Sequence, residues 1–242
     1  MTNVFDEMGV YWAEIADKNQ TQRQIQFLKS LFKPSGYVLD LACGSGRHSI
    51  ALNADGYMMV SLDASRKLLK IAKQRSEEIS VVLGDVRFLP FKIGTFAAVV
   101  SVDTSFGYLP SEADDKVSLS EVRRVLSKMS LFVIDVFNQE YLDLKYKVQN
   151  NSNKEKDYPS FFLLQKRTIS DNEGWLCDSW TIRDKADGQV RFFEHKVRLY
   201  GRDKLSCLLE SVGFKVNQVL GGYEGENFRV DSSRLIFIAM VE

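Results

Sequence analysis

The sequence predicts an α/β fold in which mostly parallel strands alternate with helices. Over residues 35–140, apolar runs of strand length alternate with amphipathic helical stretches, and a glycine-rich turn follows the first run. The fourth run, at residues 96–102, is almost continuously apolar, as expected of a strand buried on both faces. This alternation indicates right-handed βαβ units with helices on both sides of one sheet.

The predicted elements follow in order from the N-terminus. Residues 3–32 are expected to form one or two helices, because residues 20–32 carry an apolar stripe at helical spacing. A Pro-Ser-Gly break at residues 34–36 ends them. The strands of the alternating region are predicted at residues 37–41, 58–62, 79–83, 96–102 and 130–137. The helices between them are predicted at residues 47–55, 65–76 and 111–126.

The pattern changes after residue 140. The polar segment 149–156 is expected to be a loop. Turns that end in glycine separate the next strand-like runs, which predicts an antiparallel meander instead of further βαβ units. These runs cover residues 161–169, 175–184 and 190–200. The chain then returns to one helix and two strands, predicted at residues 202–212, 214–220 and 234–241.

Composition and charge restrict the class of function. Lys+Arg and Asp+Glu both total 32 in 242 residues, and this neutral balance predicts no nucleic-acid partner. No apolar run is long enough to span a bilayer, so no membrane partner is expected. The 3 cysteines include no CxxC pair, and with 2 histidines they predict neither a disulfide framework nor a metal site. The N-terminus has no basic stretch before an apolar one, which favours the cytoplasm.

The most informative segment is VLDLACGSG at residues 38–46, which joins the first predicted strand to a helix. Its two glycines let a backbone approach a ligand closely, and the free N–H groups of the following helix face the same place. Asp40 would repel a pyrophosphate, so the loop favours a cationic or amine-bearing ligand. Asp63 and Asp85 follow the next two strands, at the edge of the sheet where a ligand crevice is expected.

This segment resembles the first motif of the class I S-adenosylmethionine-dependent methyltransferases, and the resemblance continues at the family's intervals. Asp63 matches the acidic residue that takes the ribose hydroxyls. Gly84-Asp85-Val86 matches the motif whose acidic side chain faces the adenine amino group, and residues 101–108 match the segment that borders the reacting methyl. The resemblance is strong over residues 35–140 and weaker over residues 200–242.

The resemblance implies a Rossmann-like, seven-stranded methyltransferase sheet, mostly parallel, with an inserted antiparallel β meander as a lid. It divides the chain into three parts. An N-terminal helical lid covers residues 1–34, the methyltransferase core covers residues 35–145 and 200–242, and an insert over the active site covers residues 146–199. It implies S-adenosylmethionine as cofactor and S-adenosylhomocysteine as product. The cofactor-binding residues that it implies are Tyr11, Asp40, Ala42, Gly44, Gly46, Asp63, Ala64, Asp85, Val86 and Val102.

Small-molecule methyltransferases, glycine N-methyltransferase among them, often carry such a lid, so the expected function is N- or O-methylation of a small molecule by a monomer or homodimer. The protein would mainly align the nucleophile with the methyl group and exclude water. Candidate catalytic residues are His195 and Tyr108, and the alternative interpretation of His195 is an exposed strand residue. Candidate substrate residues are Ser105, Phe106, Arg198 and Tyr200.

Two other classes of protein stay open at this point. A regulatory module could bind S-adenosylmethionine without turnover, because fold alone does not fix function. A nicotinamide-dependent oxidoreductase would share the glycine turn and Asp63. However, residues 44–49 lack the third glycine of the dinucleotide fingerprint.

Overall fold

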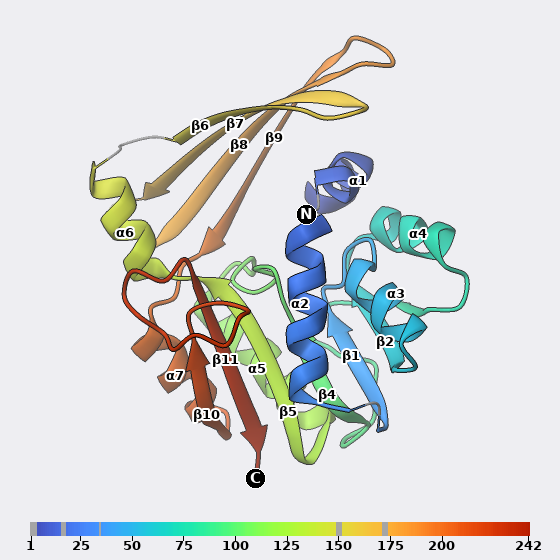
Figure 1. The fold of residues 1–242 in the computed structure, drawn as a ribbon, viewed down its shortest axis with the longest axis vertical. Coiled ribbons are helices and arrows are strands. Elements are labelled where there is room, and N and C mark those ends of the chain that lie inside the picture. Colours follow the sequence, from blue (N-terminus) through green and yellow to red (C-terminus); the bar gives the residue numbers. More distant parts are fainter. Residues whose placement is uncertain (1–3, 16–17, 34, 149–151, 171–173) are drawn as a thin grey trace.

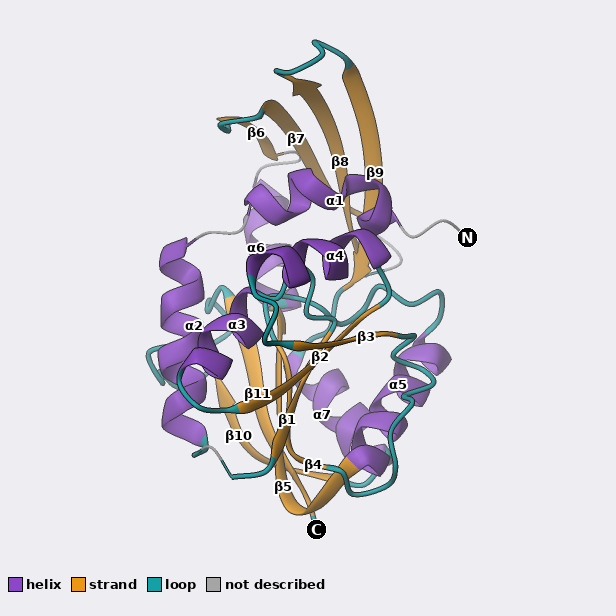
Figure 2. Cartoon of the chain, turned by 90° about the vertical axis from the view of Figure 1, so that its right-hand side faces the viewer, coloured by secondary structure: helices purple, strands orange, loops and turns teal. Residues whose placement is uncertain are grey.

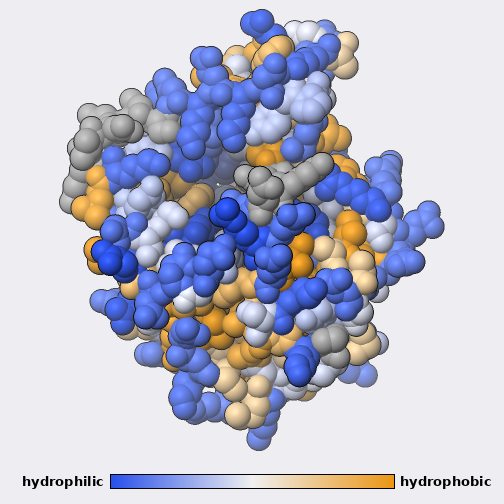
Figure 3. Space-filling model, viewed as in Figure 1, coloured by the Kyte–Doolittle hydropathy of each residue, from blue (hydrophilic) through white to orange (hydrophobic). Residues whose placement is uncertain are grey.

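The computed structural model describes residues 4–15, 18–33, 35–148, 152–170 and 174–242. Figure 1 shows two sheets, with the larger sheet in the lower part of the view and the smaller one above it. On the visible face, hydrophilic side chains cover much of the upper part, while apolar side chains gather lower down over the larger sheet (Figure 3). None of the helices in the described ranges has the length and apolar character needed to cross a membrane.

The larger sheet confirms the predicted Rossmann-like fold. Its strands are β1 (Tyr37–Leu41), β2 (Met58–Asp63), β3 (Ser80–Leu83), β4 (Phe96–Ser101), β5 (Leu126–Phe137), β10 (Phe214–Leu220) and β11 (Arg234–Val241). Their order is β10-β11-β5-β4-β1-β2-β3. β11 runs antiparallel to both of its neighbours, and β1 to β5 pair in parallel. The carboxyl ends of β1, β2 and β4 therefore meet at one edge.

Helices cover both faces of this sheet. The helices in the described ranges are α1 (Val4–Ile15), α2 (Lys18–Leu31), α3 (Arg47–Ala54), α4 (Arg66–Arg75), α5 (Glu112–Val125), α6 (Gln139–Val148) and α7 (Arg202–Ser211). Figure 2 shows α2 and α3 on one side of the strands and α5 and α7 on the other. Alternate residues of each strand supply the two cores, since side chains alternate between the faces of a sheet.

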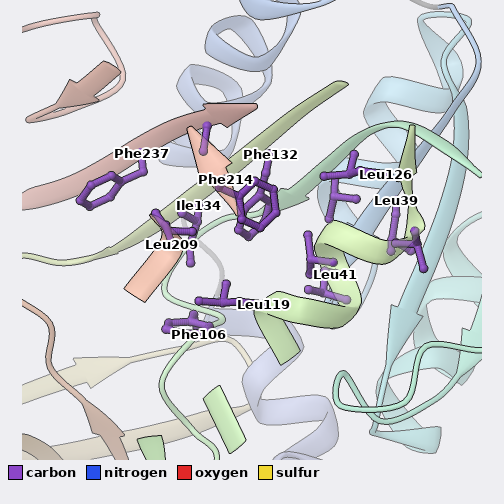
Figure 4. Close-up of a cluster of buried hydrophobic side chains, with 14 of the residues drawn as sticks. Leu39, Leu41, Phe106, Leu119, Leu126, Phe132, Ile134, Leu209, Phe214 and Phe237 are labelled. Carbon is purple, nitrogen blue, oxygen red and sulfur yellow. The ribbon is translucent and has the colours of Figure 1, made fainter. Parts of the chain in front are cut away.

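Leu39 on β1 illustrates this alternation. It is fully buried in the cluster that includes Leu119 from α5 and Leu209 from α7. Its neighbour Val38 belongs instead to the cluster that includes Leu28 from α2. Figure 4 shows part of the first cluster, in which the side chains from α5 and α7 lie against those of β1 and β5.

The smaller sheet is fully antiparallel, with strands in the order β6-β7-β8-β9. They are β6 (Ser152–Asp157), β7 (Phe161–Ser170), β8 (Trp175–Asp184) and β9 (Val190–Arg198). The expectation of a loop at residues 149–156 is wrong for β6, whereas residues 149–151 lie outside the described ranges. β6 is a charged edge strand, and charged side chains are how sheets protect exposed edges. Its sequence therefore resembles a loop although β7 supplies its hydrogen-bond partners.

Helix α1 connects the two sheets. It kinks at Gly9, whose φ of 22° lies outside the helical range. Before the kink, Asp6 Oδ1 accepts hydrogen bonds from Ser65 Oγ and Lys67 N at the start of α4, both at 2.8 Å. After it, the Tyr11 hydroxyl donates to Asp184 of β8 at 2.5 Å. Figure 2 shows α1 between α4 and the smaller sheet.

Candidate active site

The chain reverses sharply where β1 and β4 end. Ala42, Asp103 and Thr104 adopt left-handed backbone conformations, with φ of 58°, 60° and 61°. Such conformations are costly for residues with a Cβ, and they concentrate at functional sites. The Ser105 hydroxyl joins the two turns, because it donates to the Val102 carbonyl at 2.8 Å and lies 3.4 Å from the Ala42 carbonyl. We therefore locate the candidate site at this edge.

The two glycines of the loop after β1 differ in their surroundings. Both have left-handed backbones, with φ of 56° at Gly44 and 75° at Gly46. A Cβ on Gly44 would meet no described atom within 4 Å, whereas a Cβ on Gly46 would lie 3.0 Å from Ala72 Cβ and 3.2 Å from Ile79 Cδ1. Gly44 therefore borders open space that suits a ligand, and Gly46 lets α3 pack closely against α4.

Asp63 ends β2 directly beside this loop. Its Oδ2 accepts the Gly44 N–H at 2.8 Å, and its Oδ1 accepts the Ser65 N–H at 2.7 Å. Burial raises the pKa of Asp63, and the backbone hydrogen bonds, one of them from Ala64, oppose that shift. Each carboxylate oxygen has a second lone pair. Asp63 can therefore hold the loop and still accept two hydroxyl donors, as a ribose would require.

Asp40 lies deeper than Asp63. Only 2% of the residue is exposed, and its Oδ2 accepts a hydrogen bond from Ser49 Oγ at 2.5 Å. Burial raises the pKa of Asp40 to about 6. The carboxyl group therefore ties β1 to the first turn of α3 beneath the loop, and it does not face the surface.

Asp85 follows β3, and Arg87 holds it. The Arg87 guanidinium donates through Nη2 to Asp85 at 2.6 Å and through Nη1 to Asp114 at 2.9 Å. The hydrogen bonds from Arg87 lower the pKa of Asp85, so it is a carboxylate at neutral pH. The next residue, Val86, packs against the main core. Asp85 thus lies at the same edge of the sheet as Asp63, with both of its carboxylate oxygens hydrogen-bonded to Arg87.

A buried charged network lies behind the turn after β4, and the sequence analysis did not single it out. Asp135 on β5 is fully buried, and it accepts Arg234 Nε at 2.8 Å and the Asp103 N–H at 2.7 Å. Arg47, the first residue of α3, forms an ion pair with the Asp103 carboxylate. Although burial opposes it, Arg47 and Arg234 hold the pKa of Asp103 below its ordinary value. The network fixes the left-handed turn against the glycine loop.

One sequence signal could have revealed this network. Asp135 interrupts an otherwise apolar strand, LFVIDVF at residues 131–137. A buried carboxylate requires a compensating partner. Arg234, the first residue of the neighbouring strand β11, is that partner.

His195 is buried among aromatic rings, so the alternative of an exposed strand histidine is wrong. Its side chain is 5% exposed, and burial lowers its pKa to about 4, so the imidazole is neutral at physiological pH. We call the four rings around it the aromatic cluster. The cluster residues and the distances from their ring centroids to that of His195 are Phe5 (5.5 Å), Trp12 (5.8 Å), Tyr108 (6.2 Å) and Trp180 (5.5 Å). The structure thus brings together the two candidate catalytic residues from β9 and from the loop after β4.

Asp178 lies behind His195 on the neighbouring strand β8. Its Oδ2 is 3.7 Å from His195 Nε2. Arg167 on β7 binds the same carboxylate with two hydrogen bonds, from Nη2 at 2.6 Å and Nε at 2.9 Å. The carboxylate is therefore balanced by a guanidinium, which helps the imidazole stay neutral.

The side chains of four other predicted substrate or cofactor residues make their contacts within the protein. Arg198 Nε and the Tyr200 hydroxyl both donate to Asp115 Oδ2, at 3.1 and 2.7 Å. Phe106 packs in the main core, with its ring centroid 5.4 Å from that of Tyr200. Tyr11 donates to Asp184 and packs against the smaller sheet. We do not place these side chains in the proposed ligand-binding surface.

The comparisons with known proteins agree with this geometry. Residues 38–129 match a family described as a methyltransferase domain. The YqeM protein of Bacillus subtilis is 25% identical over 218 residues, which are 88% of this chain and 87% of that protein. A glycine/sarcosine N-methyltransferase of Parasynechococcus marenigrum is 33% identical over 139 residues, which are 54% of this chain and 49% of that enzyme. The structure of the CcbJ methyltransferase from Streptomyces caelestis is similar with a TM-score of 0.84 at 15% identity, over 99% of this chain and 98% of that one.

Strand order, the loop after β1 and these matches together define the class of protein. The chain carries a methyltransferase domain at residues 38–129, and it is an S-adenosylmethionine-dependent methyltransferase with the fold of the class I enzymes. The alternative interpretation as a nicotinamide-dependent oxidoreductase is therefore rejected.

Proposed function

We propose that the enzyme transfers a methyl group to a nitrogen or oxygen atom of a small molecule. One observation carries this proposal. The His195 ring of the smaller sheet lies 6.2 Å from the Tyr108 ring of the loop after β4, which supports a cover formed by the smaller sheet and α1 over the proposed cofactor-binding edge. A covered site suits a small acceptor better than a protein or nucleic-acid surface. The similarity to a glycine/sarcosine N-methyltransferase supports the same class of acceptor.

The proposed roles follow from position. When bound, the cofactor supplies a methyl group activated by its sulfonium. Asp63 would accept the ribose hydroxyls and Asp85 the adenine amino group, while the turns at Ala42 and Ser105 border the methyl group. The covering elements exclude water, and alignment of the nucleophile then provides most of the rate enhancement.

Calorimetry with S-adenosylhomocysteine tests the cofactor site. Asp63→Ala should weaken binding by about 1–3 kcal/mol, because charge-assisted hydrogen bonds to the ribose are lost. The matched control is Asp55→Ala, which removes a carboxylate from a half-exposed ion pair with Lys29 at the surface. We expect its affinity to equal that of the wild type. Equal affinity in both variants would reject the role of Asp63, and cofactor binding without product from any acceptor would favour a regulatory module.

A further inference from the structure

We propose that His195 Nδ1 and Trp180 Nε1 form the polar end of an acceptor pocket for a small amine with a neighbouring hydroxyl group. This inference rests on the proposed function, because it assigns the class of acceptor to the same site. The aromatic cluster, to which α1, the loop after β4 and β8 contribute, surrounds His195.

Two buried polar atoms lack hydrogen-bond partners among the described residues. His195 and Trp180 side chains are both almost fully buried, with 5% of the His195 side chain and 4% of Trp180 exposed. Within the described part of the chain, neither His195 Nδ1 nor Trp180 Nε1 has a hydrogen-bond partner. Buried polar atoms without partners are rare because each costs free energy. Their rings are neighbours with centroids 5.5 Å apart, so the two atoms without described partners belong to adjacent side chains.

His195 Nδ1 and Trp180 Nε1 differ in whether they donate or accept a hydrogen bond. The Asp178 carboxylate lies 3.7 Å from His195 Nε2, which favours the tautomer with the proton on Nε2. His195 Nδ1 is then an acceptor, whereas Trp180 Nε1 is only ever a donor. The pocket therefore offers an acceptor beside a donor. Its complement is a ligand with an N–H group beside an oxygen atom.

The aromatic rings and the Asp178 carboxylate near these two atoms favour nitrogen as the reacting atom. Aromatic faces attract cations such as the ammonium ion that methylation of an amine produces, and Trp12 stacks on Trp180 with centroids 5.4 Å apart. The nearby Asp178 disfavours an acidic acceptor, and its counter-ion Arg167 is already engaged by it. A neutral amine can donate its N–H to His195 Nδ1 and keep its lone pair free for attack.

The chemical step then balances without a strong base. The amine lone pair forms the new N–C bond as the C–S bond breaks, and the electrons of that bond stay on sulfur. The acceptor, which is an ammonium ion in water at neutral pH, gives one proton to solvent before it attacks, and the methylated product leaves as an ammonium ion. His195 is a positioning residue for the nucleophile in this step, because a neutral imidazole with a lowered pKa is a weak proton acceptor.

Calorimetric titration of the protein saturated with S-adenosylhomocysteine tests this assignment. The probes are cyclohexylamine, the vicinal trans-aminocyclohexanol and cyclohexanol. In the wild type, we expect the amino alcohol to bind most tightly and cyclohexanol most weakly. His195→Phe keeps a ring and removes the acceptor, so both amines should bind about tenfold more weakly.

Trp180→Phe provides the sharper test because it keeps an aromatic ring, although a smaller one, and removes the donor. It should weaken binding of the amino alcohol about tenfold and leave cyclohexylamine unchanged, which a general loss of packing would not do. The matched control is Trp175→Phe on the same strand. Trp175 lies outside the aromatic cluster, beneath Arg198, and its replacement should leave all three probes unchanged.

The outcomes separate this inference from the proposed function. If the wild type does not bind S-adenosylhomocysteine, the proposed function fails. If it binds S-adenosylhomocysteine but no probe, or if Trp180→Phe weakens both amines equally, the acceptor class is overturned. If His195→Phe loses S-adenosylhomocysteine binding, the Trp180→Phe comparison decides alone.

Discussion

Residues of the same type have different tasks in the loop after β1. Gly44 and Gly46 share a left-handed backbone, but only Gly46 has neighbours that a Cβ would crowd. The two carboxylates nearby also differ: Asp40 binds Ser49 beneath the loop, whereas Asp63 binds the loop itself. The sequence analysis placed all four residues at one site, and only the side-chain contacts separate support from ligand binding.

Alanine substitutions distinguish the two glycines. Gly46→Ala should lower the free energy of unfolding by about 2–4 kcal/mol, because a left-handed Cβ and a contact at 3.0 Å add together. Gly44→Ala should cost only about 1–2 kcal/mol of stability, from the backbone alone, and should weaken S-adenosylhomocysteine binding in addition. Urea denaturation and calorimetry measure the two effects. Equal losses of stability would contradict the assignment.

His48 makes the stability depend on pH. It is fully buried against Gln24, and burial lowers its pKa to about 3. Below the unfolded pKa of 6.5 the unfolded chain binds a proton that the folded chain excludes, so this contribution is complete above pH 6.5 and is lost as the pH falls towards 3. The pKa of Asp40 is raised to about 6, so its contribution to stability instead increases as the pH falls through 6.

The variant His48→Gln isolates this contribution from that of Asp40. Between about pH 6 and pH 4, the free energy of unfolding of the wild type should fall more steeply than that of the variant, by about 1.4 kcal/mol per pH unit. Urea denaturation at a series of pH values measures both slopes. Parallel slopes would show that His48 does not stay neutral in the folded protein.

At the scale of elements, α1 holds the two sheets together. Asp6 fixes its first half to the start of α4, and Tyr11 and Glu14 fix its second half to the smaller sheet. The sequence predicted helices in this region, but it did not predict these contacts. The partners Ser65 and Asp184 are distant in sequence, so no spacing reveals them.

Asp6→Ala should loosen α1 without unfolding the core. The variant loses the bonds to Ser65 Oγ and Lys67 N–H, while Ser65 still caps α4 through Leu68. We expect amide hydrogen exchange in α1 to accelerate about tenfold, which corresponds to the loss of about 1.4 kcal/mol. Exchange in β5 should not change. The exposed Glu7→Ala is the control, and similar exchange in both variants would contradict the role of Asp6.

At the scale of the whole molecule, the sequence predicted the larger sheet better than helix α6 and the smaller sheet. Buried parallel strands with acidic or glycine-rich ends are distinctive, so β1 to β5 lie close to their predicted positions. Helix α6 and strand β6 were not predicted because their polar residues lack a clear period.

The candidate site was predictable to the same extent. The positions of Asp63 and Asp85 follow from strand ends, which the sequence reveals. The engagement of Arg198 and Tyr200 by Asp115 and the enclosure of His195 by the aromatic cluster depend on how the two sheets meet. That arrangement is a property of the tertiary structure, and no local pattern encodes it.

The central claim is methyl transfer to a small molecule, and one measurement tests it directly. The enzyme is incubated with a cell extract and S-adenosylmethionine that carries a trideuterated methyl group, and mass spectrometry then examines the small-molecule and macromolecular fractions. We predict a labelled small-molecule product whose yield, at a cofactor concentration below saturation, falls with Asp63→Ala. Label that enters only protein or nucleic acid would contradict the account.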